Sequence, residues 1–347
     1  MARRPIIALY FSYTSLREYP YVSAVRTRTR IAFALAALLL AAEPVVAHSN
    51  GGLFLLAPFG GRAVGQGDAV VADTSIGTEG IWWNAASLAR LAKRELAVHY
   101  SSTVFATNTM IAFAAPSRVL GTLAAAYHLV DYGDQPATPA SGGDVSTGTI
   151  SNKNHMLALS YATPVGSRFS AGLSYKLVLL RFNQCSGLCG NSAGVTGSTQ
   201  ALDLGAQYRV ATAVPFTVGL AFRNLGPALQ AKDKDQADPL PRVIQGGVKM
   251  RLPIQSLTES GATLDVSVDV LSSPALVGQT AAVGFVLGYR QQLFLRGGYK
   301  LQSGEAGGPS LGLGLEREKF GFDVSRRFDG LAQLGTPPTY ISLHAKF

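Results

Sequence analysis

The chain has 347 residues, of which 47% are hydrophobic and 15% are charged, with a formal net charge of +9. A soluble domain averages about 25% charged residues, so the composition favours a membrane. Apart from residues 31–42, no apolar run approaches the roughly 18 to 20 residues of a spanning helix, which argues against a helical membrane protein. A β-barrel remains, because its backbone groups all pair between strands. Basic residues mostly alternate singly with apolar ones, so nucleic acid is not an expected partner.

The N-terminus is typical of an export signal. Arg26, Arg28 and Arg30 precede the apolar run at 31–42, and the small residues of "EPVVA" follow it. We therefore predict that residues 1–47 are a signal peptide. The alternative is a short membrane anchor, which is disfavoured because the run is too short to span a bilayer.

Residues 48–94 are rich in glycine and end in "EGIWWNAASLARL". Ile81, Ala85, Leu88 and Leu91 recur at helical spacing. We predict a turn at Asn84-Ala85-Ala86, followed by a helix face at Leu88 and Leu91 that leads into the first strand. The segment is too short to have its own core, so we expect it to pack against or inside a barrel wall. Its glycines permit tight turns and close contact with that wall.

From residue 95 onward the sequence alternates with a period of two. Leu173 and Tyr175 fall on one face of residues 169–182, whereas Ser174 and Lys176 fall on the other. One face suits lipid and the other suits water, as in the strands of a membrane barrel. Fourteen such strands are predicted, near residues 95–104, 108–116, 120–131, 154–164, 169–182, 199–210, 215–225, 241–252, 261–272, 280–290, 292–302, 309–317, 320–328 and 339–347.

The predicted fold class is all-β: a transmembrane antiparallel β-barrel of about 14 strands, with a short N-terminal hatch or plug segment. The even number of strands fits a single-chain bacterial barrel, and long connectors mostly alternate with short ones, as outer loops and periplasmic turns do. The expected organisation is a signal peptide at 1–47, the hatch at 48–94 and the barrel at 95–347. The expected location is the bacterial outer membrane, with its lipid as a partner and the chain as a monomer.

The chain ends in "YISLHAKF". Leu343 shares a face with the terminal Phe347, and Ser342 and His344 lie on the other face. We interpret Tyr340 to Phe347 as the signal that the barrel-assembly machinery recognises. The alternative is an edge strand of a soluble sandwich, but apolar stripes on so many strands would aggregate.

Charged side chains are predicted to face the lumen. These are Lys176, Asp203, Arg209, Arg223, Asp265, Asp269, Arg290, Arg296, Lys300, Glu316 and Asp323. They form either a compensating network that stabilises the barrel or a substrate path. A set of tyrosines is assigned to the membrane interface: Tyr132, Tyr161, Tyr175, Tyr208, Tyr289, Tyr299 and Tyr340.

Enzymatic chemistry is not expected. The five histidines are isolated from any nucleophile motif, and no G-x-S-x-G or HExxH pattern occurs. No catalytic residue, cofactor or metal site is predicted. The two cysteines, Cys185 and Cys189, lie in a Gly/Ser-rich loop of an exported chain, which favours a local disulfide.

The stretch "GGRAVGQGDAVVADTSIGTEGIWWNAASLARL" resembles the N-terminal signature of PorV/PorQ-family proteins. That family is similar in turn to the long-chain fatty-acid transporters of the outer membrane. The resemblance implies a fourteen-stranded monomeric barrel in which a hatch with an Asn-Pro-Ala motif fills the lumen. The matching positions are Asn84, Ala85 and Ala86, preceded by Trp82 and Trp83; Ala85 stands where the motif has proline.

Three functions are considered, and the first two follow from the resemblance. The first is passive transport or binding of a hydrophobic small molecule, with Trp82, Trp83, Leu53, Phe54, Leu55 and Leu56 as the apolar lining. The second is an accessory role in type IX-like secretion, in which loops 132–153, 183–198 and 226–240 contact exported proteins. The third is a general porin, which the plug-like segment argues against. A plugged barrel that only stabilises itself is the remaining alternative.

Overall fold

The computed structural model describes residues 51–137, 148–182, 186–187, 195–230, 237–276, 279–302, 307–330 and 335–347. The predicted signal peptide and both cysteines, Cys185 and Cys189, lie outside these residues, so the cleavage site and the disulfide stay predictions. Within the described ranges, no helix has the length and hydropathy to cross a membrane.

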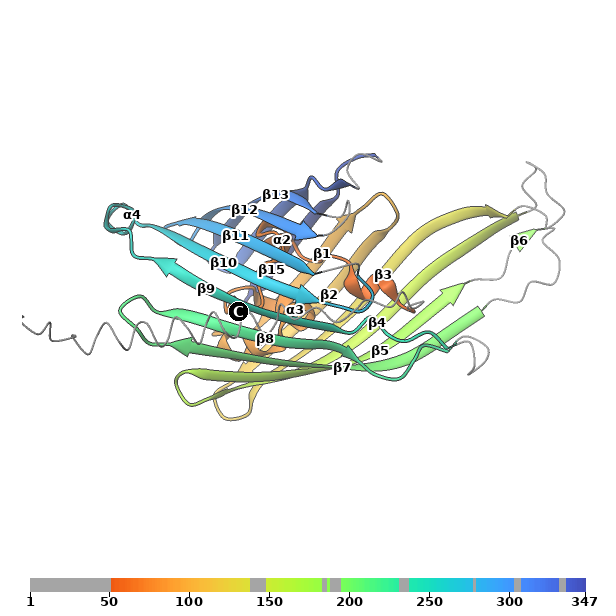
Figure 1. Cartoon of the computed structure of the whole chain (residues 1–347), viewed down its shortest axis with the longest axis horizontal. Coiled ribbons are helices and arrows are strands. Elements are labelled where there is room, and N and C mark those ends of the chain that lie inside the picture. Colours follow the sequence, from red (N-terminus) through yellow and green to blue (C-terminus); the bar gives the residue numbers. More distant parts are fainter. Residues whose placement is uncertain are drawn as a thin grey trace, which may run out of the picture. The chain divides into compact units, whose positions relative to one another are not determined.

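Fourteen strands form a closed antiparallel barrel, which confirms the predicted fold class (Figure 1). They are β1 (Glu95–Ser102), β2 (Thr107–Ser117), β3 (Gly121–Ala137), β4 (Gly148–Val165), β5 (Phe169–Phe182), β7 (Val195–Val210), β8 (Phe216–Leu225), β9 (Val243–Leu252), β10 (Ala262–Ser272), β11 (Thr280–Tyr289), β12 (Leu293–Gln302), β13 (Gly308–Arg317), β14 (Phe320–Arg327) and β15 (Thr339–Lys346). Each strand pairs with its neighbours in sequence, and β1 pairs with β15 to close the ring. A two-residue strand, β6 (Ser186–Gly187), pairs with the end of β4.

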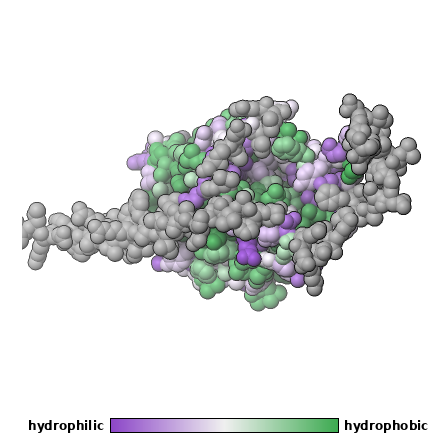
Figure 2. Space-filling model, turned by 45° about the vertical axis from the view of Figure 1, so that its right-hand side comes forward, coloured by the Kyte–Doolittle hydropathy of each residue, from purple (hydrophilic) through white to green (hydrophobic). Residues whose placement is uncertain are grey.

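The side chains of each strand alternate between the two faces of the wall. On β1, Leu96 and Val98 are exposed on the outside, whereas Ala97 and His99 are buried inside. Hydrophobic residues cover much of the outer wall in the space-filling view (Figure 2). This is the pattern of a wall that faces lipid outside and a filled lumen inside.

The strands differ in length. β3, β4, β5 and β7 have 14 to 18 residues and extend beyond their neighbours at one end of the barrel (Figure 1). We call this the loop end, and the opposite end, where β2 turns into β3, the turn end. The sequence predicted that β3 stops at residue 131 and that β4 starts at residue 154, so both strands are longer than expected. A bulge after Asp131, with Gly133 at φ 72°, interrupts the alternation of inward and outward residues on β3. The alternation pattern therefore did not predict that the strand continues beyond residue 131.

The turn end carries the short connectors, and one of them contains a helix. α4 (Gln255–Glu259) joins β9 to β10 and has no buried residue. It therefore caps the outside of the barrel and does not enter the lumen.

Residues 51–94, which we call the hatch, occupy the lumen. Their short elements are η1 (Leu53–Leu56), α2 (Gly61–Gly65), η2 (Gly77–Glu79), α3 (Gly80–Trp83) and η3 (Ala85–Arg90). The helical spacing from Ile81 to Leu91 is interrupted at Asn84, which lies in the predicted turn and adopts an extended backbone (φ −159°, ψ 104°) between α3 and η3. Its side chain accepts a hydrogen bond from Ala86 N and so begins the second helix.

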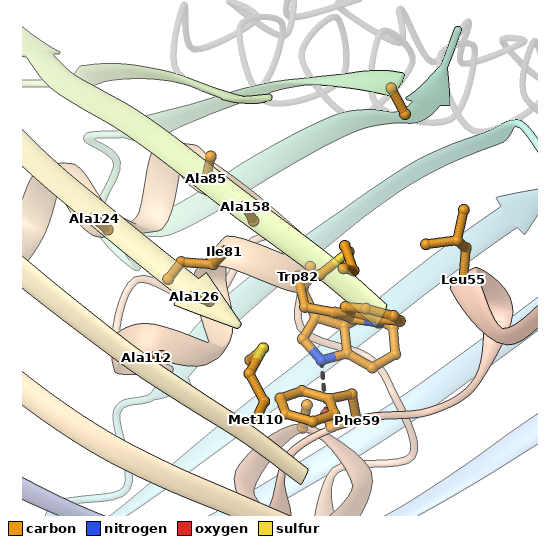
Figure 3. Close-up of a cluster of buried hydrophobic side chains, with 14 of the residues drawn as sticks. Leu55, Phe59, Ile81, Trp82, Ala85, Met110, Ala112, Ala124, Ala126 and Ala158 are labelled. Carbon is orange, nitrogen blue, oxygen red and sulfur yellow. Dashed lines mark hydrogen bonds between the residues drawn. The ribbon is translucent and has the colours of Figure 1, made fainter. Parts of the chain in front are cut away.

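Bulky hatch side chains pack against small wall residues. Trp82 and Ile81 face an alanine-rich surface formed by β2, β3 and β4 (Figure 3). Its members include Ala112, Ala124, Ala126 and Ala158. Small wall residues opposite large hatch residues allow dense packing of the lumen.

Candidate functional site

Glycines of the wall allow the hatch backbone to lie directly on the strands. A Cβ atom at Gly205 would collide with Asn84 Oδ1, and one at Gly172 would collide with the Ala85 backbone. Further wall glycines meet the hatch at residues 65–72; these are Gly219, Gly284, Gly298 and Gly312. The wall therefore has a glycine at the contact with the hatch on each of six strands: β5, β7, β8, β11, β12 and β13.

Asn84 joins the hatch to the wall. Its Nδ2 donates to Val71 O at 2.7 Å, and lies 3.3 Å and 3.4 Å from the carbonyl oxygens of Ala206 on β7 and Leu220 on β8. Asn84 is 2% exposed, so these bonds satisfy an amide that would otherwise be costly to bury. The predicted motif residue thus has a specific structural task in the hatch.

The two tryptophans have different surroundings. Trp83 Nε1 donates to Phe59 O at 2.9 Å, the bond drawn in Figure 3, and the Arg223 guanidinium lies 5.2 Å from its ring. Trp82 packs against Phe59 and His128, with ring centroids 5.5 Å and 5.1 Å away. Both tryptophans belong to the hydrophobic core, and of the two only Trp83 lines the cavity described below.

A charged cluster fixes the hatch to β13, β14 and β15. Arg62 Nε lies 2.8 Å from Asp323 Oδ2, and Arg62 Nη2 lies 2.8 Å from Glu316 Oε1. The Glu79 carboxylate accepts the backbone N–H groups of Arg62 and Ala63. Burial raises the pKa of Glu79 to about 7, although Arg62 opposes the rise.

A cavity of about 350 Å³ lies at the loop end, and we call it the loop-side chamber. Its lining is mainly apolar and includes Leu53, Phe54, Leu56, Pro58, Trp83, Val104, Phe105, Val130, Leu271 and Leu276. Polar and charged residues also line it, among them Asp68, Arg223, Gln245, Asp269, Thr280, Lys300, Arg327, Asp329 and Tyr340. An apolar pocket with a few polar groups is the usual form of a small-molecule site.

A second cavity of about 450 Å³ lies at the turn end, on the other side of the hatch. Its charged lining residues are Arg62, Asp73, Arg90, Lys93, Glu95, Lys249, Arg251, Asp265, Arg296, Glu316 and Lys346. No described residue lines both cavities. The hatch thus separates an apolar chamber from a polar one.

Of the four apolar residues predicted to line a ligand site, three line the loop-side chamber. Leu53, Phe54 and Leu56 line the loop-side chamber. Leu55 does not line it and packs in the hydrophobic core. Three of the four residues are therefore in reach of a molecule in this chamber.

Most of the charges predicted for the lumen face inward and are paired. Lys176 Nζ lies 2.5 Å from Asp203 Oδ2, and Arg296 Nη1 lies 2.6 Å from Asp323 Oδ1. Arg290 departs from the prediction, since it is exposed at the turn end and occupies a turn with φ 50°. Arg209 keeps the strand register on β7 but is exposed near the end of that strand.

Tyr132 and Tyr340 do not lie at the membrane interface as predicted, because both line the loop-side chamber. Tyr340 is 1% exposed. It shares a face with Ser342 and His344, which point inward, so alternation along β15 would have placed it correctly. The terminal Phe347, in contrast, is exposed and stacks near Phe113 at 6.3 Å.

Sequence reasoning missed the charged residues of the hatch. Arg62, Asp68 and Glu79 each bond to the wall or to the hatch itself, yet all three are at least 95% buried. Their signal was present, because isolated charges in a glycine-rich segment that must enter a lumen need buried partners. Arg62 and Asp68 pair with residues more than 200 positions away in the sequence, so the sequence did not predict which residues they pair with.

No family profile and no curated protein matches the sequence. Among solved structures, the toluene transporter TodX of P. putida has a TM-score of 0.59 at 10% identity, over 83% of this chain and 98% of that one. The toluene transporter TbuX of Ralstonia pickettii has a TM-score of 0.56 at 15% identity, over 85% of this chain and 100% of that one. The monoaromatic hydrocarbon channel CymD has a TM-score of 0.56 at 13% identity, over 86% and 99%. The chain therefore has the fold of these transporter and channel barrels.

Proposed function

We propose that this chain is a passive channel for hydrophobic small molecules in a bacterial outer membrane, and that the loop-side chamber is the entry site. The observation that carries the proposal is the mainly apolar lining of this chamber inside a lumen whose other cavity is polar. An apolar molecule that leaves water for this chamber gains free energy in proportion to the apolar area it covers.

The size of the chamber favours a small molecule. Its volume of about 350 Å³ lies within the range of roughly 300 to 1,000 Å³ that ligand pockets occupy. The fold shared with TodX, TbuX and CymD, which are described as toluene transporters and a monoaromatic hydrocarbon channel, adds support. Non-enzymatic transport is the reading that agrees with both observations.

Passage requires the hatch to part from the wall, because it separates the two cavities. A ligand opens the hatch only if it binds the open state more tightly than the closed one. PorV/PorQ membership and the accessory role in secretion rest on the sequence motif and stay predictions. The loops proposed for that role, 132–153, 183–198 and 226–240, lie partly outside the described residues.

The test is uptake of radiolabelled ethylbenzene by cells that express the full chain. Ala282→Trp fills the chamber, since Ala282 lines it on β11. Val283→Trp is the matched control, because the next residue of the strand faces the outside. We expect expression to raise the initial uptake rate, Ala282→Trp to abolish the increase and Val283→Trp to preserve it.

The amount of folded barrel in isolated membranes is measured for each variant. Uptake equal to that of cells without the chain would contradict the proposal. So would full uptake by a folded Ala282→Trp variant.

A further inference from the structure

A row of polar side chains crosses the wall of the loop-side chamber on strands β11 to β15. Thr280 stands on β11, Lys300 on β12, Arg327 on β14 and Tyr340 on β15, and all four line the chamber. We call these four residues the polar strip. A molecule that enters the chamber meets this strip as well as the apolar lining.

The charges around the chamber compensate one another. Asp68 Oδ2 lies 2.5 Å from Arg327 Nη2 and 3.4 Å from Lys300 Nζ. The charged lining residues comprise three acidic side chains, Asp68, Asp269 and Asp329, and three basic ones, Arg223, Lys300 and Arg327. A charged ligand head would lose its hydration without meeting an excess of opposite charge, which is unfavourable.

Hydrogen-bonding capacity that the described partners leave unused is, in contrast, present on the strip. Thr280 is 2% exposed, and its Oγ1 atom has no hydrogen-bond partner among the described residues. Lys300 offers three donors, of which Asp68 engages one, and Tyr340 contributes a phenolic hydroxyl. A plain hydrocarbon would cover these groups without bonding to them, whereas a hydroxyl group can both donate and accept.

We propose that the loop-side chamber selects hydrophobic molecules that carry one uncharged hydroxyl group, such as alkylphenols and alkanols. The hydroxyl binds on the polar strip, and the hydrocarbon part lies against Phe54, Leu56 and Phe105. This inference rests on the proposed function and names the substrate class of the same site. It separates the chain from a channel for hydrocarbons alone.

The test compares three probes with the same hydrocarbon part: ethylbenzene, 4-ethylphenol and 4-ethylbenzoate. At neutral pH the phenol is uncharged and the benzoate is an anion. Binding to the purified full chain in detergent is followed by calorimetry and by tryptophan fluorescence, since Trp83 lines the chamber. We expect 4-ethylphenol to bind roughly five- to tenfold more tightly than ethylbenzene, as one neutral hydrogen bond allows, and more tightly than 4-ethylbenzoate.

Two substitutions locate the hydroxyl. Thr280→Val and Tyr340→Phe each remove a hydroxyl group and keep the shape of the side chain. We expect each to lower the ratio of the affinity for 4-ethylphenol to the affinity for ethylbenzene, because the hydroxyl group on the wall that distinguishes the two probes is removed. Tyr299→Phe is the control, because Tyr299 is exposed on the outer wall and does not line the chamber. If Tyr340→Phe does not fold, Thr280→Val carries the test.

The outcomes distinguish the two proposals. Equal binding of ethylbenzene and 4-ethylphenol, or tighter binding of 4-ethylbenzoate, overturns the selectivity and leaves the channel function standing. A preference for the phenol that survives both substitutions also overturns it. Failure of all three probes to bind overturns the proposed function and this inference with it.

Discussion

The Arg62 guanidinium of the hatch and the Asp323 carboxylate of β14 lie 2.8 Å apart, although 261 residues separate them in the chain. Both side chains are at least 95% buried. The pair therefore joins the plug to the wall inside the lumen.

Arg62→Met is expected to destabilise the barrel by about 3 to 5 kcal/mol, because it leaves Asp323 and other acidic groups buried with less compensation. The measurement is the free energy of unfolding in urea in lipid bilayers. Arg251→Met is the control: Arg251 pairs with Asp265, but its side chain is 61% exposed, so the loss should stay below about 1 kcal/mol. Equal losses for the two variants would argue against the buried pair as an anchor.

Gly205→Ala is expected to cost about 1 to 3 kcal/mol, because the added methyl group must displace the Asn84 side chain. Gly297→Ala on β12 is a matched control, since the nearest atom to an added Cβ there is a Leu311 methyl group at 4.0 Å. Unfolding of both variants is measured under the same conditions. An unchanged Gly205→Ala barrel would show that the hatch does not lie against this strand.

Ala85→Pro restores the proline of the hatch motif and is expected to stabilise the chain by about 0.4 to 1 kcal/mol. Asn84 already has the extended backbone that a residue before proline prefers, and Ala85 is the first residue of η3, where proline is favoured. Ala86→Pro is the contrasting variant, because Ala86 N donates to Asn84 Oδ1. We expect thermal unfolding to occur at a higher temperature for the first variant and a lower one for the second.

Glu79 should make stability depend on pH. Its pKa is about 7 in the folded chain, compared with 4.5 for a glutamate in water, which represents the unfolded chain. At a pH between these two values the folded state therefore holds a proton that the unfolded state has lost. Raising the pH from 4.5 to 8 therefore lowers the free energy of unfolding, by roughly 1 to 3 kcal/mol. Three side chains face this carboxyl group: the charges of Arg62 and Asp323 act on it, and His99 Nδ1 lies 3.9 Å from Glu79 Oε1.

Glu79→Gln isolates this contribution, because the difference between wild type and variant removes the other titrating groups. We expect the difference in unfolding free energy to change with pH in that window and to level off above about pH 8. Glu259→Gln on the exposed helix α4 should show no such change. A constant difference for Glu79→Gln would mean that the carboxyl group does not titrate there.

The sequence predicted the barrel because its signal is local. Leu173 and Lys176 face opposite sides of β5 as the period of two requires, and that period needs no knowledge of distant residues. A turn at Asn84 was predicted, but the bonds of its side chain to β7 and β8 were not, because these strands are distant in the sequence. Local helical spacing is overridden there by tertiary contacts.

The chamber could be predicted only in part. Apolar residues 53–56 were assigned to a ligand site, yet nothing in their pattern separates Leu55, which does not line the chamber, from the three residues that do. The compensating charges of Asp68 and Arg327 belong to segments more than 250 residues apart. Such pairs become visible only when the chain is folded.

The seam between β1 and β15 gives the hatch one more property. Gly61 N donates to Ser342 Oγ on β15 at 2.9 Å, and Thr78 N donates to Glu95 Oε1 on β1 at 2.8 Å, so the hatch holds both sides of the closing pair. These bonds exist together only when the ring is shut. Ring closure and hatch docking are therefore thermodynamically linked, and a substitution that loosens one lowers the equilibrium constant of the other.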